Sequence, residues 1–322
     1  GLASGISAGS VTLHEGPTRI DIAEIEPAIV EASHEFDAFN HRPLADPRVW
    51  MMVNDARNHL LLSEDAIYDL VISEPSNPWI TGVSNLFTRE FFEIGQRKMS
   101  ADGVWAQWVH VYSIDPGDLR SLLFTFADVY KHVLLFRIDQ SDLVILGSAA
   151  PMSLDGKKLQ WILNSNAEVM ADFAAVDVHR PEDLLGQYMF SEAGIRKLAD
   201  AAGMAPRNTD DNMRIEYSTP LFLYRNTIRK NLRMIEDVAE IPMDAVEGAE
   251  GLSALARVYA KWDQTPRRTL EAIRAARSLD PGDLVIQMQS QVYERGARVR
   301  IKGAQGRQAQ DPGGEARLWA SD

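Results

Sequence analysis

Short apolar runs rich in β-branched and aromatic residues recur along the first 150 residues, and amphipathic stretches lie between them. Such runs predict strands, and apolar residues at helical spacing predict helices. The predicted strands are 19–24, 49–53, 68–73 and 104–111, and the predicted helices are 27–36, 85–99 and 115–129. Strands that alternate with helices are typical of a parallel sheet with crossover helices.

Two further apolar runs, 132–138 and 143–146, are separated only by a short polar turn. A connection this short predicts an antiparallel pair at the end of the sheet. We therefore predict an α/β fold of the Rossmann-like class I methyltransferase type. Its parallel sheet would end in an antiparallel hairpin, and a small α-helical C-terminal region would follow.

The second half of the chain reads as helical. Residues 151–208 predict short amphipathic helices, and one more helix is expected from 220 to about 236. Small and apolar positions such as Ala256, Tyr259 and Ala272 resemble one tetratricopeptide helix pair, although an amphipathic hairpin that caps the domain is the alternative. The predicted organisation is a main domain at 1–224, a helix and linker at 225–250, the helix pair at 251–297 and a disordered tail at 298–322.

Composition excludes several kinds of site. The formal net charge of the 322 residues is -13, which disfavours nucleic acid and anionic membranes as partners. The absence of cysteine excludes disulfides, thiolate metal sites and cysteine nucleophiles, and indicates a reducing compartment. The expected location is therefore the cytoplasm. The seven histidines show no metal-ligand spacing, so no metal is expected. No run of 18 or more apolar residues occurs, so no membrane span is expected in this sequence.

The chain opens with glycines at positions 1, 5 and 9. At a turn from strand to helix, small residues let backbone amides approach a ligand closely. Glu24 ends the next predicted strand about twenty residues later, where an acid accepts hydrogen bonds from ribose hydroxyls. This is the spacing of a nucleoside fingerprint; a chance pairing of glycines with a surface glutamate is the alternative. Because such a turn normally follows a buried strand, we expect the domain's first strand to be missing from this sequence.

Polar residues also follow the next two predicted strands. Asp55 comes directly after 49–53, where it would meet an adenine amino group or simply cap a helix. The strand 68–73 leads into the densest polar cluster of the chain, Glu74, Pro75, Ser76, Asn77, Pro78 and Trp79. Two prolines stiffen this loop, so it would hold a carboxylate and an amide at fixed distances from a reacting atom. Capping of the turn is the alternative.

Further residues are candidates for the walls of a pocket. Gly82 and 85–88 precede a helix and are predicted to form a lid or wall. Trp79, Trp105, Trp108 and Tyr112 would line the pocket or pack in the core. His110 is predicted to shuttle a proton or to be a packed histidine. Asp210 and Asp211 precede a strand-like run and would bind a cationic substrate or remain solvated turn residues.

Six short motifs stand out along 1–224: GLASG, IDIAEIEP, NDAR, YDLVISEPSNPW, NLFTREFF and TDDNMRIEY. Together they resemble the spermidine synthase-like superfamily. The resemblance is to the branch in which this domain follows a membrane-transporter-like region and sometimes precedes tetratricopeptide repeats. It implies that the chain is the cytoplasmic part of a longer, membrane-anchored protein.

The resemblance implies a transferase of polyamine biosynthesis that alkylates a small-molecule amine with S-adenosylmethionine or its decarboxylated form as cosubstrate, and without a metal. The residues that match the family's sites are, for catalysis, Glu74 and Asn77; for the nucleoside, Gly1, Gly5, Glu24, Asp55 and Ala56; and for the substrate, Ser76, Trp79, Tyr112, Asp210 and Asp211.

The sequence departs from the family at the loop after 68–73. Aminopropyltransferases carry an Asp-Ser-Ser-Asp-Pro type pattern whose two aspartates engage the amine; Glu74 and Asn77 stand at those positions. The longer Glu74 side chain moves its carboxylate by about 1.5 Å, and Asn77 lacks the charge. Ala3 replaces the middle glycine of the first motif. The alternatives are therefore a small-molecule methyltransferase, or a non-catalytic nucleoside-binding or scaffold module that recruits a protein partner through its helical repeat. A homodimer is a further expectation.

Overall fold

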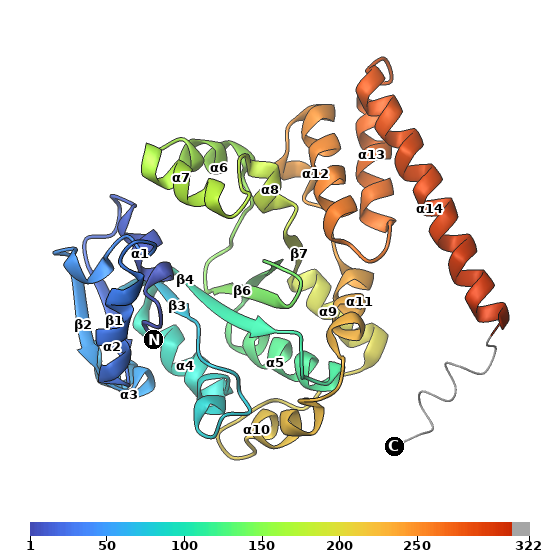
Figure 1. Cartoon of the computed structure of the whole chain (residues 1–322). Coiled ribbons are helices and arrows are strands. Elements are labelled where there is room, and N and C mark those ends of the chain that lie inside the picture. Colours follow the sequence, from blue (N-terminus) through green and yellow to red (C-terminus); the bar gives the residue numbers. More distant parts are fainter. Residues whose placement is uncertain (311–322) are drawn as a thin grey trace. The chain divides into compact units, whose positions relative to one another are not determined.

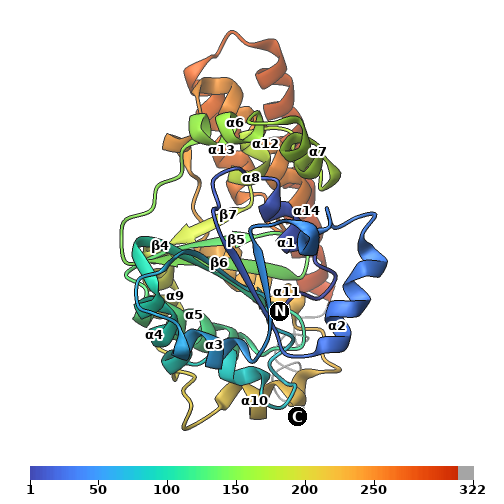
Figure 2. The same ribbon diagram turned by 90° about the vertical axis from the view of Figure 1, so that its left-hand side faces the viewer.

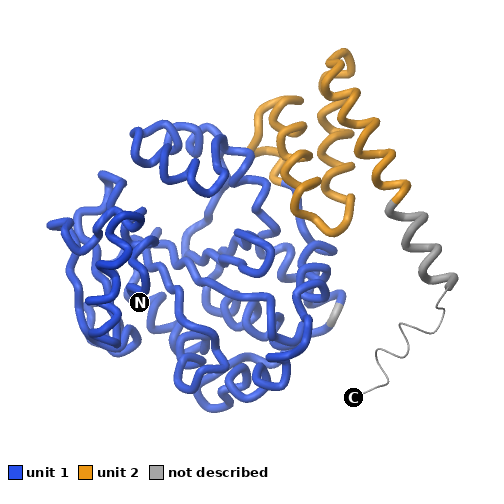
Figure 3. Tube along the Cα trace, in the orientation of Figure 1, with its two compact units in different colours: residues 1–241 blue, residues 242–322 orange. Residues whose placement is uncertain are grey.

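The computed structural model describes residues 1–310, without the side chains of residues 202 and 300–310. The chain divides into two compact units, Gly1–Ile241 and Pro242–Asp322 (Figure 3). Among the described residues, no helix combines the length and the apolar character that a membrane span needs.

Two sheets organise the first unit (Figure 1). The strands are β1 (Ile20–Glu24), β2 (Val49–Val53), β3 (Tyr68–Ser73), β4 (Met99–His110), β5 (His132–Arg137), β6 (Asp142–Ser148) and β7 (Tyr188–Ser191). β1 and β2 form a parallel pair, and the other strands form a mixed sheet in the order β3-β4-β6-β5-β7. β3 runs parallel to β4, whereas β4, β6, β5 and β7 pair antiparallel.

This is the predicted Rossmann-like methyltransferase fold, with a mixed sheet and the expected β5–β6 hairpin. The prediction that 151–208 is helical throughout is wrong at β7. Four residues are too few to show the alternation of buried and exposed positions that marks a strand. Met189 and Phe190 are adjacent and both buried, so they show no such alternation. Pairing with the edge of β5 determines their conformation.

Helices cover the sheet. In both views α4, α5 and α9 lie against one face of the mixed sheet, and α6 to α8 lie on the other side (Figures 1 and 2). The helices of this unit are α1 (Ile6–Thr12), α2 (Pro27–Ala32), α3 (Ala56–Leu62), α4 (Arg89–Lys98), α5 (Pro116–Val129), α6 (Gly156–Leu163), α7 (Ala167–Ala175), α8 (Pro181–Leu185), α9 (Glu192–Ala202), α10 (Arg214–Ser218) and α11 (Ile228–Val238). The expected strand-like run after Asp211 is wrong, because α10 occupies it; the helix expected from 220 begins at Ile228, after a 3-10 turn.

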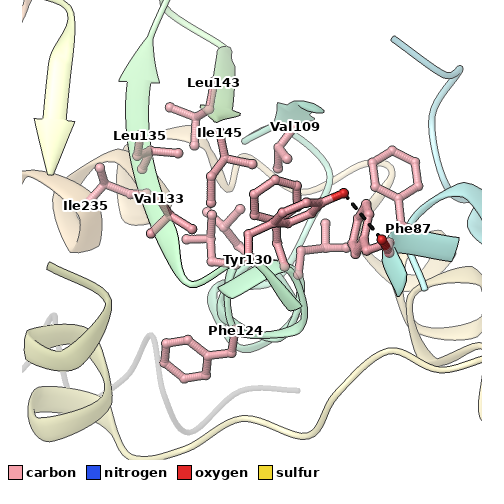
Figure 4. Close-up of a cluster of buried hydrophobic side chains, with 14 of the residues drawn as sticks. Phe87, Val109, Phe124, Tyr130, Val133, Leu135, Leu143, Ile145 and Ile235 are labelled. Atoms are coloured by element: carbon pink, nitrogen blue, oxygen red, sulfur yellow. Dashed lines mark hydrogen bonds between the residues drawn. The ribbon is translucent and has the colours of Figure 1, made fainter. Parts of the chain in front are cut away.

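The core fills the space between the mixed sheet and α4 and α5. Figure 4 shows Leu135 of β5 and Ile145 of β6 gathered around Tyr130. The Tyr130 hydroxyl donates a hydrogen bond to the Phe92 carbonyl at 3.3 Å. The buried phenol is therefore satisfied, as the low polarity of its surroundings requires.

Within residues 1–310 the two sheets do not share a strand pair: β1 pairs only with β2, and β3 pairs only with β4. Side chains connect them instead, since the Tyr68 hydroxyl donates a hydrogen bond to Asp21 Oδ2 at 3.0 Å.

Replacing Gly95 with alanine should lower the stability of the first unit by about 1–3 kcal/mol, as overpacking of a core does. Gly95 lets α4 lie directly on Trp105, and an added Cβ would come within 2.0 Å of the indole ring. Urea unfolding measures the effect. Gly16→Ala is the matched control, because nothing lies within 4 Å of its added methyl group. Equal stabilities of the two variants would contradict this packing.

The second unit is the α-helical C-terminal region, with α12 (Gly248–Trp262), α13 (Arg267–Leu279) and α14 (Leu284–Gln310). Asp263 and Arg268 form an ion pair at 2.6 Å with both side chains 2% exposed, and the Arg268 guanidinium lies 4.1 Å from the Tyr259 ring centroid. The tetratricopeptide assignment and the domain boundaries stay predictions. The expected tail, 298–322, overlaps the end of α14 and from 311 lies outside the described residues.

Candidate functional site

The glycine-rich turn packs against the end of β1. Gly5, the N-cap residue of α1, has φ +79°, and Ala3, at φ +47°, also adopts the left-handed conformation that favours glycine. Leu2 N–H donates a hydrogen bond to Glu24 Oε2 at 2.8 Å. A Cβ on Gly1 would lie 3.3 Å from the same oxygen. The structure therefore brings together the glycines and the acid that the spacing singled out.

Glu24 is a buried acceptor. Glu24 is 8% exposed, and its Oε1 accepts a hydrogen bond from Glu26 N–H at 3.0 Å. Burial alone would raise the pKa of Glu24, but the backbone donors at Leu2 and Glu26 outweigh it and hold the pKa below 4.5. The carboxylate is therefore ionised at neutral pH and can accept a further hydrogen bond.

Asn40, which the sequence did not single out, holds the turn in place. Its buried amide donates hydrogen bonds to the Ser4 carbonyl at 2.9 Å and to the Ser33 carbonyl at 3.1 Å. The backbone carbonyl of Asn40 lies so close to α1 that a Cβ on Gly9 would be 1.8 Å from its oxygen. The third glycine therefore serves close packing rather than ligand contact.

Asp55 lies at the same strand edge as Glu24. β1 and β2 pair with Glu24 opposite Val53, and Asn54 N–H donates a hydrogen bond to the Glu24 carbonyl at 2.9 Å. Asp55 caps α3, since its Oδ1 accepts a hydrogen bond from Asn58 N–H at 2.8 Å. Capping is thus observed, and one carboxylate oxygen remains for a ligand. Ala56 is the first residue of α3.

The loop after β3 meets the start of α1. Ser7, in the first turn of α1, donates a hydrogen bond from its hydroxyl to Glu74 Oε2 at 2.9 Å. Glu74 is exposed, and so is Ser76. The glycine-rich turn, Glu24 and Glu74 therefore meet at one edge, and Ser7 is a member of the site that the sequence analysis missed.

Asn77 is held by an aromatic cluster, which consists of Trp79, His110 and Tyr112. The Tyr112 hydroxyl donates a hydrogen bond to Asn77 Oδ1 at 2.9 Å. Trp79 packs edge-on against Tyr112, with ring centroids 6.0 Å apart, and against His110, with centroids 5.1 Å apart. This fixes both the ring positions and the orientation of the amide.

His110 is a packed histidine. It is 0% exposed, and neither ring nitrogen has a hydrogen-bond partner among the described residues. Burial lowers its pKa to about 4, so the imidazole is neutral at physiological pH. Trp105 is likewise buried in the core, whereas Trp108 donates a hydrogen bond from its indole to Asp142 at 3.1 Å.

Asp210 is paired with Arg57, the last residue of the NDAR motif. Arg57 Nη1 donates to Asp210 Oδ1 at 2.9 Å and Nη2 donates to Oδ2, so the pair is bidentate. Burial opposes ionisation, but hydrogen bonds from Arg57 and Thr88 lower the pKa of Asp210. The charge of Asp210 is thus already compensated, whereas Asp211 is exposed.

Most of the segment 83–88 is packed against the rest of the unit. Ser84, Phe87 and Thr88 are each 0% exposed, and the Asn85 carbonyl accepts a hydrogen bond from Arg57 Nη1 at 2.9 Å. The described residues contain no cluster of histidines and carboxylates arranged to hold a metal ion.

Comparison with known families gives a match over the first part of the chain. The family model of the spermine/spermidine synthase domain matches residues 4–136. Residues 4–136 are thus similar to a spermine/spermidine synthase domain. The match takes in the glycine-rich turn from Ser4 onward, Glu24, Asp55, Glu74 and Tyr112.

The chain is also similar to curated aminopropyltransferases and putrescine N-methyltransferases. The chain is 31% identical over 118 residues to polyamine aminopropyltransferase 2 of Streptomyces coelicolor, covering 36% of this chain and 21% of that one. It is 32% identical over 110 residues to spermidine synthase 1 of Pisum sativum, covering 33% of each. It is 30% identical over 101 residues to putrescine N-methyltransferase 3 of Nicotiana tabacum, covering 30% of this chain and 26% of the relative. The chain thus spans a third or less of these relatives' length.

Solved structures with a similar chain trace include a spermidine synthase in complex with the transition state analogue AdoDATO. It has a TM-score of 0.39 and 16% identity, and covers 47% of this chain and 51% of that one. A probable spermidine synthase from Corynebacterium glutamicum has a TM-score of 0.41 and 17% identity, and covers 64% and 78%.

Proposed function

We propose that the domain transfers an alkyl group from S-adenosylmethionine or its decarboxylated form to a small-molecule amine. The observation that carries this proposal is the hydrogen bond from Ser7 to Glu74. It places a solvent-accessible carboxylate beside the turn whose backbone amides and buried Glu24 suit an adenosine-like molecule.

Each residue has a distinct part in the proposed binding. Gly1 and Gly5 let the backbone approach the nucleoside, and Glu24 accepts hydrogen bonds from its ribose hydroxyls. Asp55 and Ala56 face the adenine, with the Asp55 oxygen that does not cap α3 as the acceptor. None of these roles requires a metal.

Glu74 is the proposed base. It accepts a proton from the acceptor ammonium, so that the nitrogen lone pair becomes available. The sulfonium nucleoside supplies the electrophilic carbon: a nitrogen–carbon bond forms as the carbon–sulfur bond breaks, and its electron pair stays on sulfur as a neutral thioether. Once the amine is deprotonated, its nitrogen and the electrophilic carbon need only be aligned. The stiff loop therefore contributes mainly by positioning the amine.

The acceptor side is assigned to Ser76, Trp79, Tyr112 and the Asp210–Asp211 pair. Asp211 is exposed and available to a cation. Asp210 acts through Arg57, because their ion pair fixes the loop before α10 to the start of α3. This makes Asp210 a positioning residue in the proposal rather than a contact to substrate.

Methyl transfer is the second candidate. The relatives at 30–31% identity include putrescine N-methyltransferases as well as an aminopropyltransferase. The two reactions share the amine chemistry and differ in the group transferred, so the nucleoside that is consumed separates them.

Mass spectrometry of the products tests the proposal. The chain is incubated with putrescine and other amines and with each of the two sulfonium nucleosides, while calorimetry measures the binding of methylthioadenosine. We expect binding together with a new alkylated amine. Binding without turnover of any amine would indicate instead a nucleoside-binding module that recruits a partner through its C-terminal helices, and absence of binding would refute both.

A further inference from the structure

The last helix presents two apolar faces. α14 lies beside α13 in the second unit (Figure 1), where Ile286 and Ala297 are buried. The opposite face carries an outer stripe of five apolar side chains that are 61–72% exposed, namely Leu284, Val285, Met288, Val292 and Val299. An α-helix turns by about 100° per residue, which sets the two groups on opposite sides. A helix that is apolar on both sides is ordinarily covered on both.

The outer stripe has the spacing of a seam between two helices. Val285, Met288, Val292 and Val299 follow one another at steps of three, four and seven residues, as the inner positions of a coiled coil do. Part of the stripe lines a hollow with a volume of about 390 Å³, which can receive side chains from a neighbouring helix. The stripe therefore fits a second helix that runs along α14.

Charges of opposite sign lie at the two ends of the stripe. Asp280 is exposed just before α14, and Asp283 accepts a hydrogen bond from the first turn of the helix at 2.7 Å. Arg295 and Arg298 stand at exposed positions in the second half. Neither arginine forms an ion pair among the described residues, because the nearby Glu294 is shared by two arginines of α13. Antiparallel to a copy of itself, the helix would bring opposite charges together; parallel, it would bring like charges together.

We infer that a second copy of this chain covers the outer stripe, its α14 packed antiparallel about a twofold axis at Met288. In that register Leu284 of each copy lies opposite Val292 of the other, and Met288 lies opposite itself. Arg295 falls level with position 281, between the two acids that precede the helix. The surface is thus complementary to itself in apolar character and in charge, as a twofold interface requires. The inference concerns the second unit alone and is independent of the proposed function.

Disulfide cross-linking tests the register. The chain contains no cysteine, so one introduced cysteine reports one contact. Met288→Cys should give a disulfide-linked dimer under mild oxidation, because the two sulfurs meet at the axis. Val299→Cys is the matched control, since both side chains are 67% exposed, but Val299 would lie about 33 Å from its copy, far beyond the reach of a disulfide. We expect at least a tenfold difference in yield on a non-reducing gel; equal yields would overturn the antiparallel interface.

Analytical ultracentrifugation of the full chain measures the association itself. We expect a reversible dimer, and Met288→Glu should raise its Kd by about a hundredfold, because it places two carboxylates together at the centre of the interface. Val176→Glu, at an apolar position of the first unit that is 69% exposed, is the control and should leave the Kd unchanged. A chain that stays monomeric at every concentration would overturn the inference, and so would a dimer that Met288→Glu leaves intact.

Charge reversal separates a second copy from other covers of the stripe. Asp280→Arg and Arg295→Asp should each weaken the dimer by about tenfold, and the two together should restore it, because each copy supplies both halves of the pairs. Failure of the double variant to restore the dimer would overturn the inference. Thermal melting checks that each variant is folded. A monomer whose melting temperature falls in Met288→Glu would show that the chain's own first unit covers the stripe, which also overturns it.

Discussion

Replacing Glu74 with glutamine should lower the rate of alkyl transfer by about a hundred- to ten-thousandfold, the usual range for loss of a general base. Glutamine is nearly the same size and can still accept the hydrogen bond from Ser7, so the loop keeps its position. It cannot take a proton from the amine. Affinity for methylthioadenosine should stay the same, because the proposed nucleoside contacts lie on the turn and on Glu24. Product formation by mass spectrometry and calorimetry measure the two effects.

Glu15→Gln is the matched control for this experiment. Glu15 is an exposed carboxylate just beyond α1, so its loss changes the net charge by the same amount away from the site. Both the rate and the nucleoside affinity should be those of the wild-type chain. If Glu74→Gln retained full transfer, Glu74 would not be the base, and another group would have to accept the proton.

Strand positions in the first half follow directly from local sequence. The predicted 49–53 and 68–73 agree with β2 and β3 at both ends, because polar turns and helix caps bound each apolar run. β4 is less regular: it begins at Met99, five residues before the predicted start, in a polar stretch that continues the pairing with β3. Here the neighbouring strand, rather than the residues themselves, extends the element.

The edge at which the candidate site forms was also predictable. Residues that follow parallel strands collect at the carboxyl edge of a sheet, which is why Glu24, Asp55 and Glu74 were all singled out. The contacts that orient them were not predictable. Ser7 and Glu74 are 67 positions apart, and Arg57 and Asp210 are 153 apart. Such pairs depend on how the elements pack, and no local pattern encodes them.

Glu24→Gln should weaken the binding of methylthioadenosine by about a hundredfold. Both carboxylate oxygens accept hydrogen bonds from backbone N–H groups. An amide has only one acceptor oxygen, so it would direct its NH₂ group at Leu2 or at Glu26 and leave a buried donor unpaired. The glycine-rich turn would then shift away from the nucleoside. Calorimetry measures the change, and Glu31→Gln, an exposed position on α2, is the control.

The dependence of stability on pH should show whether the charge of Glu24 stabilises the fold. The comparison is between the wild-type chain and Glu24→Gln. The pKa of Glu24 lies below its ordinary value of 4.5 in the folded chain. A lowered pKa stabilises the fold fully above the unfolded value, and this contribution is lost as the pH falls through the folded pKa. The wild-type chain should therefore unfold at a higher urea concentration than Glu24→Gln at neutral pH, and the difference should shrink below about pH 4.5 as Glu24 becomes protonated and loses its charge. A difference that is independent of pH would mean that Glu24 stabilises the turn by its shape and not by its charge.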